Sequence, residues 1–98
     1  MSMVMQLSFS ASLDTDRAQY TIGRVTARAP WRGADREIEE LDRGIALRAL
    51  IREAEEYGAD GVVEIAYAVE ECAAGECEGV KLRRVVATGR AVRLALAA

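Results

Sequence analysis

The stretch Gly58-Ala59-Asp60-Gly61-Val62-Val63-Glu64-Ile65-Ala66-Tyr67-Ala68-Val69 predicts the end of a helix, a tight turn and a strand. Gly58 follows a charged, periodic segment and suits the left-handed conformation in which many helices end. From Val62 onward, bulky residues alternate with smaller or polar ones, which is the period of a half-buried strand. The stretch therefore predicts a helix that stops at Gly58 and a strand over residues 62–69.

Upstream of this turn, the sequence predicts one amphipathic helix that begins after Asp35. Asp35 is a suitable N-cap, and the glutamates that follow it suit the positive end of the helix dipole. Apolar side chains recur at three- and four-residue steps, as expected for a helix with one buried face. These residues are Ile38, Leu41, Ile45, Ala49, Leu50, Ala54 and Tyr57.

Two more segments predict strands. Residues 20–29 are rich in β-formers, Gly23 is a candidate bulge position, and Pro30 ends the run. In residues 80–94 the alternation changes phase at Arg83-Arg84, where we expect a β-bulge. With that bulge, one sheet face would carry Val63, Ile65, Tyr67, Val80, Leu82 and Val85 beneath the helix.

The order strand, helix, strand, strand predicts an α+β fold. We expect a β-α-β-β unit with an antiparallel or mixed sheet and one main helix on one face, forming a single domain over residues 1–98. Residues 1–12 are expected to be flexible or to add a short strand. Because so short a chain has a thin core and its second sheet face keeps apolar residues, association of subunits is expected to cover that face.

Composition excludes several classes of protein. The chain has 98 residues, with 13 basic and 16 acidic side chains interleaved, so no basic stripe for nucleic acid is present. The apolar C-terminal run, residues 91–98, is too short for a membrane helix, and the N-terminus lacks the features of a signal peptide. We therefore expect a cytoplasmic protein without nucleic-acid or membrane partners. The absence of histidine removes the usual general base, so we expect no enzyme and no catalytic residues.

The segment Glu70-Glu71-Cys72-Ala73-Ala74-Gly75-Glu76-Cys77-Glu78 concentrates two thiols and four carboxylates at a predicted hairpin tip. If the loop closes, Cys72 and Cys77 face each other at a distance compatible with a disulfide. The same closeness would let both thiolates bind one soft divalent ion such as zinc or cadmium, with Glu71 and Glu76 as further ligands. Such a site is partial, and a neighbouring subunit would be able to complete it. A redox-sensitive disulfide and two incidental loop thiols are the alternatives.

The stretch from Glu53 to Ile65, together with the final strand Ala87-Thr88-Gly89-Arg90-Ala91-Val92, resembles the YbjQ-like family. Members of this family are described as putative heavy-metal-binding proteins. The step Ile22-Gly23-Arg24-Val25 is similar to part of the family's first strand, whereas the segment before the helix is unusually short. The resemblance implies a small α+β fold and a ring-like homopentamer, in a compact or divergent member.

Together these patterns favour a non-enzymatic oligomeric binding protein whose ligand is a soft heavy metal at the hairpin cysteines. The alternative is an assembly that binds a small molecule or an anion between subunits through Tyr67, Glu64 and arginines, in which the cysteines play no part. Glu64 is either a buried base or the ion-pair partner of Arg84 or Arg90.

Overall fold

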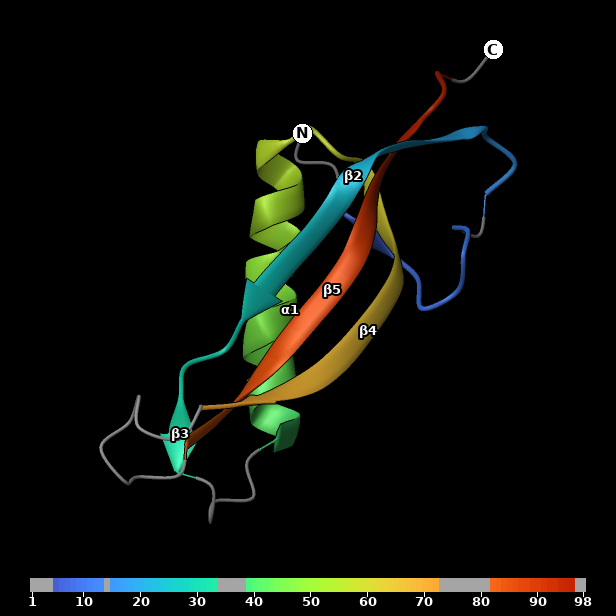
Figure 1. Ribbon diagram of the computed structural model, residues 1–98. Coiled ribbons are helices and arrows are strands. Elements are labelled where there is room, and N and C mark those ends of the chain that lie inside the picture. Colours follow the sequence, from blue (N-terminus) through green and yellow to red (C-terminus); the bar gives the residue numbers. More distant parts are fainter. Residues whose placement is uncertain (1–4, 14, 34–38, 73–81, 97–98) are drawn as a thin grey trace.

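The computed structural model describes residues 5–13, 15–33, 39–72 and 82–96. The elements are, in chain order, β1 (Gln6–Leu7), β2 (Gln19–Arg28), β3 (Arg32–Gly33), α1 (Glu39–Glu56), β4 (Gly61–Glu71) and β5 (Leu82–Leu94). The helix packs on a mixed sheet of five strands (Figure 1), which confirms the predicted α+β fold. Among the described residues, no helix combines the length and the hydropathy needed to cross a membrane.

The sheet has the strand order β1-β4-β5-β2, and the short β3 pairs with the start of β5. Among the strand pairs of the described residues, β1–β4 is parallel and the others are antiparallel. Helix α1 lies across one face and contacts β2 and β5 more than β4. We call the other side of the sheet, which carries the side chains pointing away from α1, the open face.

The helix packs through a narrow stripe of apolar residues. Ala46, Leu50 and Ala54 recur every four residues and are fully buried against the sheet. Gly58 ends the helix with a φ of 72°, and its N–H donates to the carbonyl of Glu55 at 2.9 Å, which confirms the predicted C-terminus. The predicted cap, Asp35, lies outside the described residues.

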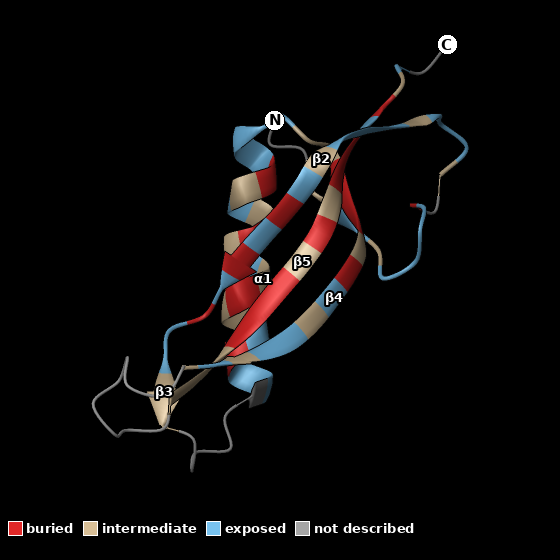
Figure 2. Cartoon of the chain, in the orientation of Figure 1, coloured by how far each residue is buried: buried red, intermediate tan, exposed pale blue. Residues whose placement is uncertain are grey.

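Alternate side chains of β2 point toward the helix and form part of the core. Val25 and Ala27, with Ala29 just beyond the strand, are buried on the helix side, while the residues between them are exposed (Figure 2). The register of β2 against β5 shifts between Thr21 and Gly23, so the predicted bulge near Gly23 is confirmed.

The bulge that we expected at Arg83-Arg84 is wrong. Both arginines pair in register with β4, Arg83 opposite Glu71 and Arg84 opposite Glu70. The irregularity instead interrupts β4, between Val63 and Ala66. The alternation along β5 changes phase there because Arg84 lies on the open face, where an aromatic ring and a carboxylate contact it.

The β4 bulge determines which apolar residues face the helix. Glu64 adopts a positive φ of 54°, which a side chain tolerates poorly. As a result Val62 and Ile65 both belong to the core under the helix, whereas Val63 packs in a separate open-face cluster. The expectation that Val63 shares a face with Ile65 is therefore wrong, because an extra residue lies between them.

The N-terminal segment covers one end of the open face. The short strand expected from the sequence is confined to Gln6–Leu7 beside β4. The chain then bends, and Leu13 becomes buried against the open-face cluster of Val63, Val92 and Leu94. This segment gives the sheet a second, smaller core opposite the helix.

A buried ion pair ties β3 to the helix. Asp42 is 3% exposed and accepts from Nε and Nη2 of Arg32 at 3.3 Å. An unpaired buried carboxylate would cost free energy of folding, so Asp42 holds Arg32 in place. Because β3 pairs with the start of β5, the chain before the helix is fixed at the end of the sheet where the β4–β5 hairpin turns.

Alanine substitutions at two glycines should change the stability of the protein in opposite directions, and they therefore test this packing. A Cβ on Gly89 would come within 2.5 Å of Cγ1 of Val62, so Gly89→Ala should destabilise the protein by about 1–3 kcal/mol. A Cβ on Gly44, inside α1, would meet nothing within 4 Å, so Gly44→Ala should stabilise by about 0.5–1 kcal/mol. Urea unfolding of both variants measures the difference, and equal effects would contradict the close Gly89 contact.

Candidate functional site

Cys72 lies at the turn end of the β4–β5 hairpin, directly after Glu71, the last residue of β4. Its backbone N–H donates to the carbonyl of Leu82 at 3.0 Å, so it closes the last pair of the hairpin stem. Its side chain is half-buried and its sulfur is in a disulfide. The chain contains one other cysteine, Cys77, and both Cys77 and Glu76 lie outside the described residues.

Of the predicted ligand set, the structure therefore describes Cys72 and Glu71. The side chain of Glu71 is exposed. Because neighbouring side chains of an extended chain point to opposite faces, it points away from the face that carries the side chain of Cys72. Within the described ranges, no three cysteine, aspartate or glutamate side chains form a group that could hold a metal ion.

Beside Cys72 on the open face lies a group that we call the Arg84 cluster: Arg84, Glu70, Arg28 and Trp31. Arg84 donates from Nε to Oε1 of Glu70 at 2.7 Å and also contacts that oxygen through Nη2. Nε of Arg28 approaches the same oxygen at 3.7 Å. The guanidinium of Arg84 lies 4.1 Å from the centroid of the Trp31 ring, which is a cation–π contact.

The Arg84 cluster changes the electrostatics expected for the hairpin. The sequence places four carboxylates near the thiols, but the nearest one on the same face, Glu70, is paired with two arginines. A planar guanidinium held between a carboxylate and an indole ring fixes the stem of the hairpin. The sequence signal for this role lies in Trp31 and in the Arg83-Arg84 pair; at the two arginines the alternation predicts a bulge instead.

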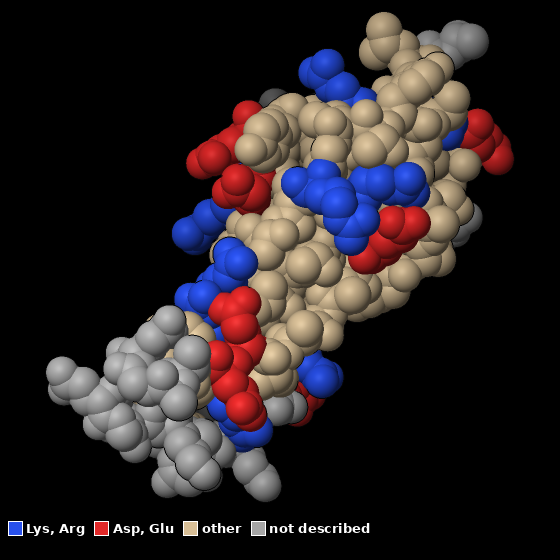
Figure 3. All heavy atoms as spheres, viewed as in Figure 1, with Lys and Arg blue, Asp and Glu red and all other residues tan. Residues whose placement is uncertain are grey.

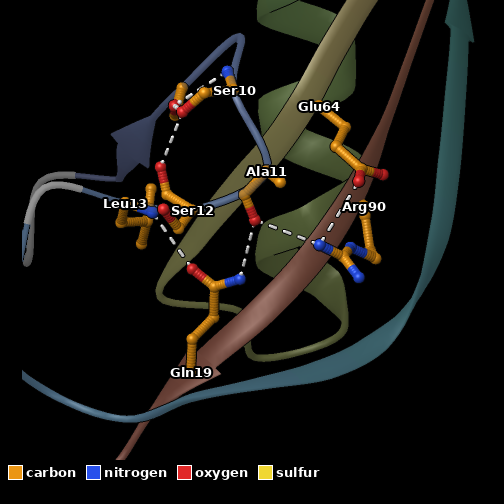
Figure 4. Close-up of polar contacts among 8 residues, drawn as sticks. Ser10, Ala11, Ser12, Leu13, Gln19, Glu64 and Arg90 are labelled. Atoms are coloured by element: carbon orange, nitrogen blue, oxygen red, sulfur yellow. Dashed lines mark hydrogen bonds and ion pairs between the residues drawn. The ribbon is translucent and has the colours of Figure 1, made fainter.

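A second polar group lies at the other end of the open face (Figure 4). The β4 bulge directs the N–H of Glu64 to the carbonyl of Ser10 at 2.8 Å, and its carboxylate pairs with Nη2 of Arg90 at 3.5 Å. The same Nη2 donates to the carbonyl of Ala11 at 3.1 Å, which also accepts from Gln19. Glu64 therefore has the ion-pair role that the sequence offered as an alternative to a buried base.

The aromatic residues do not converge on one site within the chain. Tyr67 lies on the helix side, 6.2 Å from Phe9 between ring centroids, with the guanidinium of Arg43 over its ring. The Glu64–Arg90 pair is on the open face. A site that combines Tyr67 with this pair would have to draw on more than one subunit.

The comparison with protein families decides the affiliation of the chain. The model of the YbjQ family, described as putative heavy-metal-binding, matches residues 32–95. The chain belongs to the YbjQ family. A crystal structure of a protein of unknown function from Pediococcus pentosaceus, a member of the DUF74 family, superposes with a TM-score of 0.55 at 14% identity. The match covers 93% of this chain and 98% of that one, so the two share a fold. No curated protein matches the chain in sequence.

The Arg84 cluster predicts a difference between two arginines of the open face. Arg84→Lys removes the forked contact with Glu70 and weakens the stacking on Trp31, and because the pair is partly exposed it should destabilise the protein by about 1 kcal/mol. Arg24 has no hydrogen bond or ion pair with any described residue, so Arg24→Lys should change stability by less than about 0.5 kcal/mol. Urea unfolding followed by tryptophan fluorescence measures both, since Trp31 is the only tryptophan.

Proposed function

We propose that this YbjQ-family member is a non-enzymatic, homo-oligomeric binding protein that takes a soft divalent metal ion at its reduced hairpin cysteines. One observation carries the proposal: Cys72 is disulfide-bonded, so a second sulfur is able to reach it. Two sulfurs that can bond to each other can, once reduced, bind one ion such as zinc or cadmium. The family's description as putative heavy-metal-binding supports this reading.

The donor atoms of the hairpin fit a soft ion better than a hard one. Thiolates of Cys72 and Cys77 are the preferred ligands of zinc and cadmium, and the carboxylates of Glu71 and Glu76 supply oxygen ligands nearby in sequence. A closed tetrahedral site needs four ligands, so water or a second subunit would complete one built on two thiolates. Bound metal would hold the hairpin tip in one conformation and supply no reaction.

Binding of this kind requires reduction. Thiolates bind metal ions, whereas the sulfurs of a disulfide carry no such charge. The Arg84 cluster and the Cys72–Leu82 hydrogen bond hold the stem without using the sulfur, so these contacts are available in either oxidation state.

Titration with cadmium tests the proposal. The reduced protein should bind about one ion per chain with thiolate-to-cadmium charge-transfer absorption, and the double variant Cys72→Ser, Cys77→Ser should lose more than about 100-fold in affinity. Glu71→Gln with Glu76→Gln should weaken binding less, because thiolates dominate the affinity for a soft ion. The oxidised wild-type protein should not bind.

Glu55→Gln, on the exposed helix surface far along the chain from the hairpin, is the matched control and should bind like the wild type. Unchanged cadmium affinity in the double serine variant would remove the metal from the proposal.

A second candidate, an anion bound on the open face, is favoured by the pairing of two arginines. Arg24 stands directly opposite Arg90 in the register of β2 and β5. Among the described residues, Glu64 pairs with Arg90, and no carboxylate pairs with Arg24. This proposal leaves the cysteines without a role. Phosphate should then raise the melting temperature of the wild type but not of Arg24→Gln, and equal shifts in both proteins would rule out this site.

A further inference from the structure

We propose that the start of β4 is a binding site for an extended, uncharged peptide segment, and that residues 5–13 of the chain itself occupy it in this structure. We call residues 5–13 the N-terminal strap. The strap is then an internal competitor, which an external segment of the same chemistry displaces. Neither the strap nor this site involves the cysteines of the proposed metal site.

Backbone hydrogen bonds hold the strap as the edge of a sheet holds a peptide. The strap includes β1, which is parallel to β4. The N–H of Ser8 donates to the carbonyl of Val62 at 3.0 Å, and the N–H of Ile65 donates to the carbonyl of Ser8 at 3.2 Å. These contacts do not depend on the side chains of the strap, so another extended segment can make them.

The bulge in β4 supplies a donor that a regular strand edge lacks. With Glu64 at a φ of 54°, the N–H groups of Glu64 and Ile65 both point to the strap. The N–H of Glu64 donates to the carbonyl of Ser10 at 2.8 Å. In a regular strand only alternate residues direct their N–H groups to the same neighbour. The strained residue therefore aims two adjacent donors at one extended chain.

One buried side chain anchors the strap. Leu13 is 6% exposed and packs in the apolar cluster of the open face. Gly61 provides the space for it: a Cβ at this position would lie 2.7 Å from Cδ1 of Leu13 and 2.8 Å from the carbonyl oxygen of Gln6. The slot therefore accepts an aliphatic side chain because residue 61 is glycine.

Two side chains of the sheet hold the strap beside this anchor, and both contact its backbone (Figure 4). Gln19 accepts from the N–H of Leu13 at 3.1 Å and donates to the carbonyl of Ala11 at 3.2 Å. Nη2 of Arg90 donates to the same carbonyl at 3.1 Å. The site thus selects for an extended backbone with an aliphatic residue two positions after the carbonyl that both side chains contact.

The composition of the strap indicates which external segment fits. Its nine residues carry no charged side chain, although 30% of the whole chain is charged. The charged side chains of the open face form separate clusters with uncharged surface between them (Figure 3). Residues 10–12, just before the anchor, are small and exposed. We therefore expect an extended, uncharged segment with small residues before one aliphatic anchor.

The strap can leave without loss of the main core. It contributes only the half-buried Met5 to the apolar residues packed under the helix. Of its other apolar side chains, Leu7 is 39% exposed and Phe9 is 65% exposed, so their burial stabilises the strap little. Ordering of the whole strap costs conformational entropy, which opposes its binding. Local opening of such a segment precedes global unfolding.

A synthetic peptide with the sequence of residues 5–13 tests the site. It should bind the full-length Leu13→Ser protein, whose strap has lost its anchor, at least about 10-fold more tightly than the wild type, because the wild-type strap competes for the site. Fluorescence anisotropy of the labelled peptide measures both affinities. The same peptide with Leu13→Ser is the matched control and should bind neither protein.

Gly61→Ala distinguishes an open strap from an open site. The added Cβ fills the anchor slot, so this variant should release its strap and also fail to bind the peptide. Gly23→Ala, where a Cβ meets nothing within 4 Å, should behave like the wild type. Hydrogen exchange of the Glu64 N–H should be faster in Leu13→Ser and in Gly61→Ala, and the peptide should slow it again only in Leu13→Ser.

A folded Leu13→Ser protein that does not bind the peptide at about 1 mM would overturn the proposal. Binding that leaves the exchange of the Glu64 N–H unchanged would also overturn it, because the peptide would then lie elsewhere. Circular dichroism confirms the fold of each variant. If Leu13→Ser is unfolded, Gln19→Ala, which removes one holding side chain and keeps the anchor slot, takes its place and should bind the peptide more tightly than the wild type.

Discussion

The bulge in β4 is the constraint on which the rest of the structure depends. An extra residue at Glu64, with φ of 54°, lets Val62 and Ile65 both face the helix and turns Val63 to the opposite side. The strained backbone is tolerated because Gly89 opposite it has no Cβ, which leaves space for Val62. The bulge also turns two successive N–H groups outward, to Ser8 and Ser10, so it brings the N-terminal segment beside the sheet and ends its pairing there. Among the described residues, no strand pairs with the outer edge of β4 beyond Ile65.

Charge is distributed along the open face so that two carboxylates each have an arginine partner. Glu64 pairs with Arg90 at one end, and Glu70 pairs with Arg84 and Arg28 at the other. The first pair anchors the N-terminal segment and the second anchors the hairpin stem. Both pairs are partly exposed, so their contribution lies in fixing these segments more than in net stability.

The fold was predictable because its main signals are local. Gly58 ended the helix as predicted, and the α+β class followed from the order of the periodic segments. The position of the β4 bulge was not predictable, because Val62 and Val63 are both apolar and period-two alternation fits either one in the core. The contact of Trp31 with Arg84 joins segments far apart in sequence, and no local pattern indicates it. For the candidate site, the sequence identified the cysteine-bearing hairpin but not the arginines that neutralise its nearest carboxylate.

Cys72 lies at the hairpin end of the sheet, at the opposite end of β4 from the bulge. It follows Glu71, the last residue of β4. Its neighbours in the stem are held by the Arg84 cluster, whose contacts do not include the sulfur. A change in the sulfur, from disulfide to thiolates or from thiolates to a metal complex, therefore acts on the hairpin tip first. The backbone hydrogen bond from Cys72 to Leu82 and the ion pair of Arg84 with Glu70 involve no sulfur, so the same contacts are available to the stem when the disulfide is reduced.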